Sequence, residues 1–240
     1  MAIATTHVTY EHNGTTFEAH VAWDDGQDGP RPGVLVSHAW AGRSPFEDQR
    51  AVALAEMGYV GFALDVYGKG VLGGGPEENT KLMQPLLDDR AELQARLAAG
   101  LATLRGLDQV DAARTAIIGY CFGGLCALDL ARTGADINGA ISIHGLFAAP
   151  DNHTDTEITA RILALHGWAD PMAQPDTVLA LADELTGKGA DWQLHAYGNT
   201  MHAFTNPEAN DPDFGTVYDA AADRRSWQAI ANFLAEGFVD

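Results

Sequence analysis

Short apolar runs alternate with amphipathic stretches along most of this chain. The runs contain few polar residues, as expected for strands buried on both faces of a parallel sheet; they cover residues 33–37, 59–64, 115–118, 140–143 and 162–165, and residues 192–197 are interpreted as the last strand. Between them, apolar positions recur with helical spacing over residues 45–57, 82–104, 125–130, 175–185 and 218–234. Strands that alternate with helices predict an α/β fold with a mostly parallel central sheet and helices on both faces.

The N-terminal part follows a different pattern. Two β-like runs, residues 6–10 and 17–23, flank Asn13-Gly14, which is the strongest short signal for a hairpin. We therefore expect an antiparallel hairpin at one edge of the sheet. Three long connections are predicted as loops, at residues 70–79, 146–160 and 199–217, and Pro85 should split the 82–104 helix or start its main part. The composition does not change along the chain, so residues 1–240 predict a single domain.

The charge balance excludes several classes of partner. With 14 Lys and Arg against 33 Asp and Glu, the net charge is −19, which argues against nucleic acid and anionic membranes. No apolar run reaches the ~18 residues of a membrane span, and the N-terminus shows no secretory signal. The two cysteines, Cys121 and Cys126, should point to different faces and form no disulfide. These features predict a cytoplasmic protein, and they leave its oligomeric state open.

One turn combines a strand, a reactive side chain and a helix. It reads Gly119-Tyr120-Cys121-Phe122-Gly123, which is the G-x-S-x-G pattern of a nucleophile elbow with sulfur in place of oxygen. The flanking glycines suit a turn in which two chain segments come too close for a Cβ. The alternative is an ordinary turn with a buried structural cysteine, so a base and an acid must be found elsewhere.

Polar residues that follow the predicted strands supply a candidate acid and a candidate base. Asp170 follows one predicted strand, and His202 lies in the loop after the last one; strand ends of this kind meet at one edge of a parallel sheet. A thiol needs an imidazole to take its proton, and the imidazole needs a carboxylate to orient it. The order Cys121, Asp170, His202 is that of the α/β-hydrolases. Rival bases at strand ends are His38, His144 and His166, and Asp65 is a rival acid that we expect to bind loop amides instead.

An oxyanion that forms on the substrate would need backbone N–H donors. We expect these from Phe122 and from Trp40, in the loop after the 33–37 strand. The sequence has no H-x-x-x-H, H-E-x-x-H or C-x-x-C spacing and no P-loop, so no metal site is predicted. Cys126 falls among apolar helix residues and is expected in the core.

Together these motifs resemble the dienelactone hydrolases, a branch of the α/β-hydrolases with a Cys-His-Asp triad. The resemblance covers about the whole chain and rests on GYCFGG around Cys121, HGWADPM around Asp170 and HAFTNP with His202, with VLVSHAWAG and GYVGFALDVYG as early strands. It implies hydrolysis of a small ester or lactone, as by a carboxymethylenebutenolidase, through a cysteine nucleophile and without a cofactor.

The chain departs from the family pattern at two positions. Ala39 stands where members often carry a glutamate that interacts with the thiol, and Asn206 stands where members acting on dienelactone carry an arginine that holds the substrate carboxylate. Other cations that could bind a carboxylate are Arg43, Lys69 and Lys81. The pocket is predicted at strand ends, with ordinary packing as the alternative for each large side chain: Ala39, Tyr67, His144, Trp168 and Asn206.

Two other functions stay open. A non-catalytic binding protein could keep the hydrolase fold, although it would not need a complete triad. A thioesterase or a peptidase could use the same triad. If His202 is the base, activity should fall on the acid side of neutrality as its imidazole gains a proton.

Overall fold

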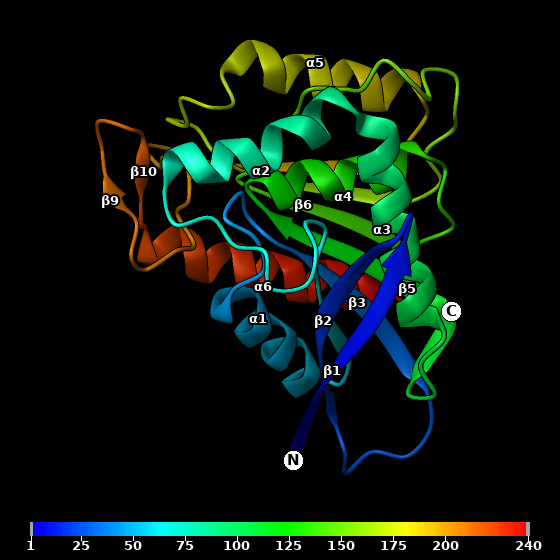
Figure 1. Cartoon of the computed structure of the whole chain (residues 1–240). Helices are drawn as coiled ribbons and strands as arrows, with labels where there is room; N and C mark the ends of the chain where they lie inside the picture. The colour runs from blue at the N-terminus through cyan, green and yellow to red at the C-terminus, as the bar shows by residue number, and fades with distance from the viewer. Residues whose placement is uncertain (1, 239–240) are drawn as a thin grey trace. The chain divides into compact units, whose positions relative to one another are not determined.

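The computed structural model describes residues 2–238, and the chain divides into two compact units, residues 1–118 and 119–240. In the first unit the hydrogen-bonded strand order is β1-β2-β4-β3-β5. Its elements (Figure 1) are β1 Ile3–His12, β2 Thr15–Asp24, β3 Arg31–Ser37, α1 Pro45–Glu56, β4 Val60–Leu64, α2 Pro76–Asp88, α3 Arg90–Arg105 and most of β5 Val110–Tyr120.

The N-terminal hairpin is confirmed and extends beyond the predicted runs. Asn13 and Gly14 both have positive φ angles, 48° and 76°, as a tight two-residue hairpin turn requires. This turn fixes the register, which starts with His12 opposite Thr15 and ends with Ile3 opposite Asp24. Strand β2 also pairs antiparallel with β4, whereas β3 and β4 are parallel.

Helices cover both faces of the sheet in the first unit. A Cβ on Gly61 of β4 would meet the backbone of Ala51 in α1, whereas a Cβ on Gly100 of α3 would meet the side chain of Leu64. Positions 61 and 64 differ by an odd number along one strand, so their side chains point to opposite faces. Helices α1 and α3 therefore pack on opposite sides of β4.

The predicted break at Pro85 is wrong. Pro85 lies inside α2, and the helical stretch breaks at Asp89 instead. The Asp89 side chain accepts a hydrogen bond from the Glu92 N–H at 3.0 Å and thereby caps α3. The predicted loop 70–79 also ends early, because α2 begins at Pro76, a residue well suited to the first helical position.

The second unit is a parallel sheet between helices. Strands β6, β7 and β8 lie in that order and are all parallel. A Cβ on Gly139 of β6 would meet Phe233 of α6, while a Cβ on Gly124 of α4 would meet Ser142 of β6, so these helices cover opposite faces. The elements are α4 Phe122–Arg132, β6 Gly139–Ile143, β7 Arg161–Gly167, α5 Pro175–Gly187, β8 Trp192–Tyr197, β9 Asn210–Asp211, β10 Thr216–Val217 and α6 Ala220–Gly237.

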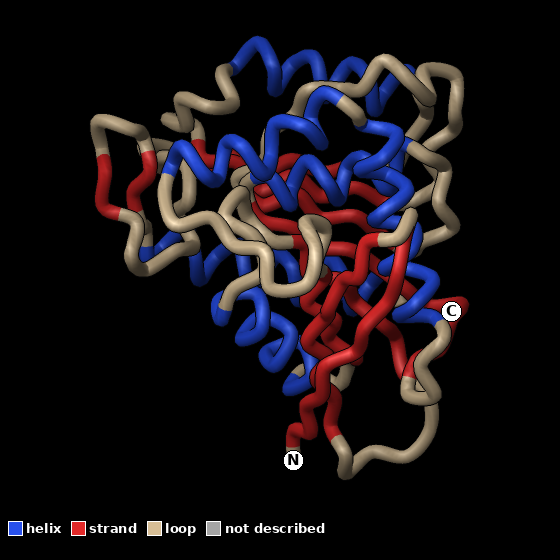
Figure 2. The backbone as a smooth tube through the Cα atoms, in the orientation of Figure 1, coloured by secondary structure: helices blue, strands red, loops and turns tan. Residues whose placement is uncertain are grey.

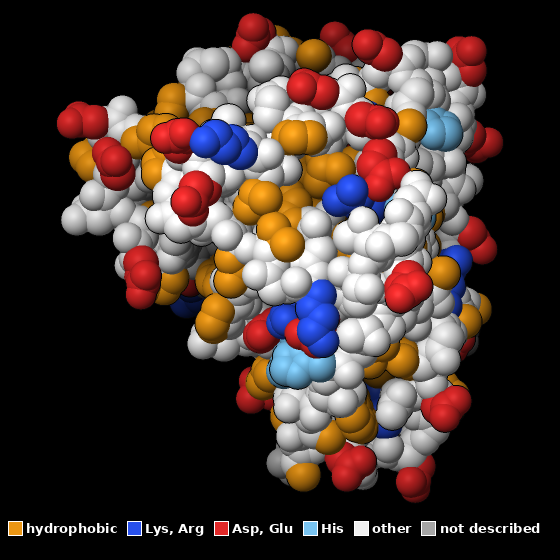
Figure 3. Space-filling view, viewed as in Figure 1, with side chains coloured by type: hydrophobic (Ala, Val, Ile, Leu, Met, Phe, Trp, Pro, Cys, Tyr) orange, Lys and Arg blue, Asp and Glu red, His pale blue; other side chains and the backbone are white. Residues whose placement is uncertain are grey.

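The predicted fold class is confirmed: the chain has an α/β fold with a mostly parallel central sheet, helices on both faces and an antiparallel strand pair at the N-terminus. The loop 199–217 is less irregular than predicted, because β9 and β10 form a short antiparallel ribbon within it (Figure 2). Asp and Glu side chains are spread over the face seen in Figure 3, in keeping with the net charge of −19. Within residues 2–238, none of the helices is both long and apolar enough to span a membrane.

Candidate active site

Cys121 lies at a sharp turn between β5 and α4, as the elbow motif predicts. Its backbone has φ 57° and ψ −117°, a conformation that costs free energy for any residue with a Cβ. A Cβ on Gly119 would collide with the carbonyl group of Gly123. The two chain segments on either side of Cys121 can therefore approach each other only because glycine stands at position 119.

The cysteine side chains occupy different environments. Cys121 is half-buried, whereas Cys126 is buried inside α4, and neither forms a disulfide. The prediction that Cys126 lies in the core is therefore confirmed. Only Cys121 keeps access to solvent, which a nucleophile needs.

His202 and Asp170 form a buried pair in the same unit as Cys121. His202 Nδ1 lies 2.7 Å from Asp170 Oδ2, and the two side chains are 2% and 0% exposed. The other oxygen of Asp170 accepts a hydrogen bond from the Met172 N–H at 2.8 Å. The loop that carries His202 is held by a backbone bridge between His202 and Thr216 of β10. Together these contacts fix the orientation of the imidazole.

The other ring nitrogen of His202, Nε2, is the one that Asp170 does not bind. Nε2 is buried and has no well-directed hydrogen bond, a common state for catalytic groups before substrate binds. Burial alone would lower the pKa of His202, but the charge of Cys121 and the interactions with Asp170 and Cys121 raise the pKa to about 10. The imidazole is thus protonated throughout the range from pH 5 to 8. The pKa of His202 therefore lies on the alkaline side of neutrality, and the loss of activity expected from the sequence on the acid side stays a prediction.

His144, a rival base, instead supports the elbow. Its Nδ1 accepts a hydrogen bond from the Cys121 N–H at 3.2 Å, and its Nε2 lies 2.9 Å from Thr205 Oγ1. Because Nδ1 accepts, the ring proton lies on Nε2 and points to the Thr205 hydroxyl. The ring also packs edge-on against His202, with 5.0 Å between centroids. With both nitrogens engaged, His144 is poorly suited to take a proton from a thiol.

The other two histidines at strand ends have different surroundings. His38, in the first unit, has Nδ1 2.7 Å from the Ala39 carbonyl oxygen, and its Nε2 accepts from the Val66 N–H at 3.3 Å. His166 is fully buried, and neither of its ring nitrogens has a hydrogen-bond partner. Burial lowers the pKa of His166, so it stays neutral. Of the four histidines, the hydrogen bond to a buried carboxylate favours His202 as the base.

Asp65 binds loop amides, as predicted. Its Oδ1 accepts from the N–H groups of Tyr67 and Gly68 at 2.9 and 3.0 Å. It therefore shapes the turn that follows β4 in the first unit.

The three predicted carboxylate-binding cations already have acidic neighbours. Arg43 pairs with Asp48 and Glu18, Lys69 with Glu18, and Lys81 with Glu77. Each would have to leave or share its partner to bind a substrate carboxylate.

The two predicted oxyanion donors belong to different compact units. Phe122 is the first residue of α4, so its amide lies at the positive end of the helix dipole, which favours a nearby negative charge. Trp40 lies in the loop after β3, where its carbonyl oxygen accepts a hydrogen bond from Tyr67 Oη at 3.0 Å. Each placement is compatible with the assigned role, and the pairing of the two amides stays a prediction.

The remaining pocket candidates also stay predictions. Trp168 is 50% exposed and packs near His166. Asn206 is exposed, and its Oδ1 accepts a hydrogen bond from the Glu208 N–H. The Ala39 N–H donates to the buried Glu47, at 3.3 Å from Oε1. A carboxylate therefore lies beside the backbone of residue 39.

Sequence reasoning missed the role of Thr205. Its hydroxyl lies 2.9 Å from Nε2 of His144, which in turn accepts a hydrogen bond from the backbone N–H of Cys121. The only available signal was its position three residues after His202 in the HAFTNP motif, and that position alone does not reveal the partner.

Comparisons with known proteins identify the family of the chain. The model of the dienelactone hydrolase family matches residues 17–238. The solved structure called m3DLH is 35% identical, with a TM-score of 0.95 and full coverage of both chains. A dienelactone hydrolase-like promiscuous phosphotriesterase from metagenomic libraries is 34% identical, with a TM-score of 0.94, again over both whole chains. A probable 2-oxo-3-(5-oxofuran-2-ylidene)propanoate lactonase of Bradyrhizobium is 28% identical over 86% of this chain and 84% of its own length. The chain belongs to the dienelactone hydrolase family.

Proposed function

We propose that this protein hydrolyses small carboxylic esters or lactones, with Cys121 as nucleophile, His202 as general acid and base, and Asp170 as the residue that orients His202. The observation that carries the proposal is the buried hydrogen bond of 2.7 Å between His202 and Asp170, in a site where the charge of Cys121 raises the pKa of the same imidazole. Nucleophile, base and orienting acid are the three parts that covalent catalysis by a thiol needs.

In the first step, the Cys121 thiolate attacks the carbonyl carbon and forms a C–S bond. The carbonyl electron pair moves onto oxygen, where the Phe122 N–H and, as predicted from the sequence, the Trp40 N–H stabilise the charge. The C–O bond to the leaving group then breaks while His202 donates its Nε2 proton to the departing oxygen. The products are an alcohol, or the ring-opened hydroxyl of a lactone, and a thioester on Cys121.

In the second step, the neutral His202 takes a proton from water, and the hydroxide attacks the thioester carbonyl. Collapse of this intermediate breaks the C–S bond and regenerates the thiolate beside a protonated imidazole. Asp170 keeps Nε2 directed at the reacting atoms in both steps. In both steps the protons move between His202, the leaving group and water. The proposed mechanism therefore requires no cofactor.

We further propose that residues 1–240 act as one hydrolase domain on small molecules in the cytoplasm. The match of one family model to residues 17–238, which include parts of both units, supports a single domain. A reducing compartment suits a free thiol at position 121.

A second activity is favoured by one relative. The structure that is 34% identical over the whole chain is described as a promiscuous phosphotriesterase. The same thiolate could attack the phosphorus of an aryl phosphotriester and displace an aryloxide. This would leave a phosphorothiolate on Cys121, which water would then have to resolve.

The test is turnover of a panel of aryl esters, lactones, thioesters, a peptide anilide and an aryl phosphotriester. The wild type is compared with Cys121→Ala and, as a matched control, Cys126→Ala. We expect ester or lactone turnover to fall by a factor of about 10⁴ or more in Cys121→Ala, because triad members act as a unit. Cys126→Ala should retain turnover, since Cys126 is buried in α4.

Mass spectrometry after treatment with iodoacetamide provides the second measurement, and we expect carbamidomethylation at Cys121 alone. Turnover that survives Cys121→Ala would remove Cys121 from the mechanism. Preference for thioesters or the anilide would favour a thioesterase or a peptidase. No turnover of any substrate, together with an unlabelled Cys121, would favour the binding protein.

A further inference from the structure

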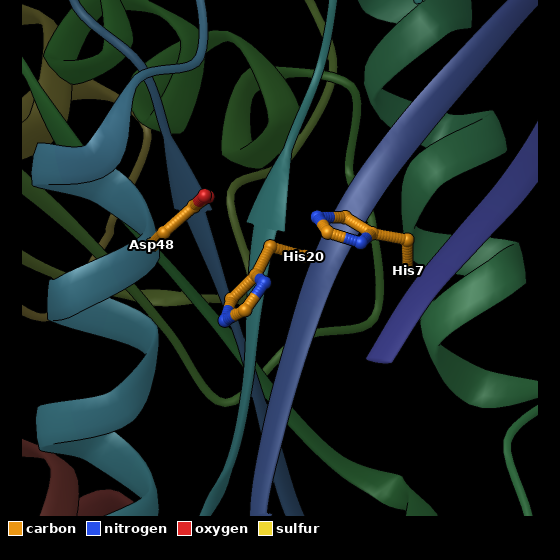
Figure 4. Close-up of side chains that lie close together, drawn as sticks. All are labelled: His7, His20 and Asp48. Atoms are coloured by element: carbon orange, nitrogen blue, oxygen red, sulfur yellow. The ribbon is translucent and has the colours of Figure 1, made fainter. Parts of the chain in front are cut away.

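A second group of histidine and carboxylate side chains lies in the first unit. The hairpin register places His7 of β1 directly opposite His20 of β2, and their ring centroids are 5.2 Å apart. Asp48 comes from the first turn of α1. Figure 4 shows the three side chains converging from two strands and a helix, and one ligand atom from each lies within 4.8 Å of the other two.

One ring nitrogen of His20 lacks the hydrogen-bond partner that a buried nitrogen normally has. Its Nδ1 is buried and has no hydrogen-bond partner, although buried polar atoms in folded proteins are nearly always bonded. A ring nitrogen without a hydrogen-bond partner can offer its lone pair to a metal ion when the imidazole is neutral.

Asp48 is held in place by a neighbour that leaves one oxygen available. Its Oδ1 accepts a hydrogen bond from Arg43 Nη1 at 2.6 Å, and Arg43 Nη2 also lies 3.5 Å from Glu18 Oε1. Carboxylates that ligate metals are commonly oriented by such hydrogen bonds. Glu18 offsets part of the positive charge of Arg43, and Oδ2 of Asp48 remains for a ligand.

We propose that His7, His20 and Asp48 form a binding site for a divalent transition-metal ion of the Zn²⁺ type. Two imidazoles and one carboxylate suit Zn²⁺ and its neighbours in the first row, whereas Ca²⁺ and Mg²⁺ prefer oxygen ligands alone. His7 is exposed, so its ring can rotate to bring its nitrogen to the ~2.0–2.1 Å of a Zn–N bond. Water would complete the coordination shell.

The location of the site determines its effect. An ion bound there would link β1, β2 and α1, three elements of the first unit. A ligand that binds the folded chain alone stabilises it. None of the three residues belongs to the proposed triad, so the metal site can stand or fall independently of the proposed function.

Zn²⁺ itself is the probe, titrated calorimetrically into untagged, EDTA-treated protein. The background is Cys121→Ala, because a thiol beside His202 would also bind Zn²⁺. In this background, His7→Ala and Asp48→Asn each remove one proposed ligand. His195→Ala, which replaces an exposed histidine of the second unit, is the matched control. Thermal unfolding is followed for every variant with and without Zn²⁺.

We expect one Zn²⁺ site in the background and in His195→Ala, with a rise of several degrees in the unfolding midpoint at saturation. His7→Ala and Asp48→Asn should each weaken binding at least tenfold and lose this rise, while their metal-free midpoints show that they are folded. Absence of Zn²⁺ binding in the background would overturn the proposal. So would binding that survives both substitutions, or that His195→Ala weakens equally.

Discussion

The chain uses histidine and aspartate in two regions, and the two regions differ in how these groups are held. In the second unit, His202 and Asp170 are almost fully buried and joined by a hydrogen bond of 2.7 Å. In the first unit, His7 is exposed, His20 and Asp48 are half-buried, and their ligand atoms lie up to 4.8 Å apart. The first arrangement fixes one imidazole in one orientation. The second leaves a gap between groups that all offer lone pairs.

The pKa values of the two histidines show what this difference does. Burial acts to lower the pKa of both His20 and His202. For His202, the charge of Cys121 and the interactions with Asp170 and Cys121 outweigh the effect of burial and raise the pKa to about 10. For His20, the opposing effect of Asp48 is too weak, and the pKa falls. The same residue type thus has its pKa raised in one region and lowered in the other, because its neighbours differ.

The largest effect is expected from breaking the buried pair. Asp170→Asn should lower the rate of ester hydrolysis by a factor of about 10³–10⁴, because the amide no longer fixes the tautomer and orientation of His202. The carboxylate also raises the pKa of His202, so its loss should lower this pKa. The remaining activity should therefore decline at a lower pH than the wild type, whose alkaline decline is expected near pH 10.

The measurement is a pH profile of kcat/KM for an alkyl ester in a pH-stat, with Asp176→Asn as the control. Asp176 is an exposed residue in the first turn of α5, and its replacement should leave the profile unchanged. An alkaline limb that does not move in Asp170→Asn, or that moves to higher pH, would contradict the role assigned to Asp170.

A smaller effect is expected from changing Thr205, which contacts the histidine that bonds to the Cys121 backbone. Thr205→Val removes the hydroxyl that bonds to Nε2 of the buried His144, and an unsatisfied buried N–H costs about 1–3 kcal/mol of unfolding free energy. Denaturant unfolding measures this loss, and the alkylation rate of Cys121 reports whether the elbow shifts. Thr205→Ser keeps the hydroxyl and should behave like the wild type. Equal stability of the Val and Ser variants would show that the hydroxyl does not support His144.

The smallest effect on stability is expected when His7 is replaced in protein that contains no bound metal ion. His7→Ala should change the unfolding free energy of metal-free protein by less than about 0.5 kcal/mol, because an exposed side chain makes few contacts that folding requires. Urea unfolding in the presence of EDTA measures this change in unfolding free energy. A loss of 2 kcal/mol or more would show that His7 already stabilises the hairpin, and the contrast between the two regions would then disappear.

The elements with strong local signals were predicted well. The tight turn at Asn13-Gly14, the apolar strands, and the sharp turn at Cys121 between glycines all follow from steric rules that act over a few residues. The break at Asp89 was missed because Pro85 is the stronger local signal, yet Pro85 lies within α2, which continues to Asp88. Similarly, the ribbon of β9 and β10 consists of two-residue strands too short to give a periodic pattern.

The sequence by itself determined the fold class, the elbow and the order of the candidate triad, because hydrophobic period, glycine sterics and strand-end position are local properties of the chain. Tertiary structure decided which histidine meets a carboxylate. His144, His166 and His202 all follow or end strands, and only the packing of distant segments places the ring of His202 against Asp170 and engages His144 with Cys121 and Thr205. It also brought Asp48 to the histidine pair of the hairpin. Burial and hydrogen-bond partners set the charge of an imidazole, and both arise from residues far apart in the sequence.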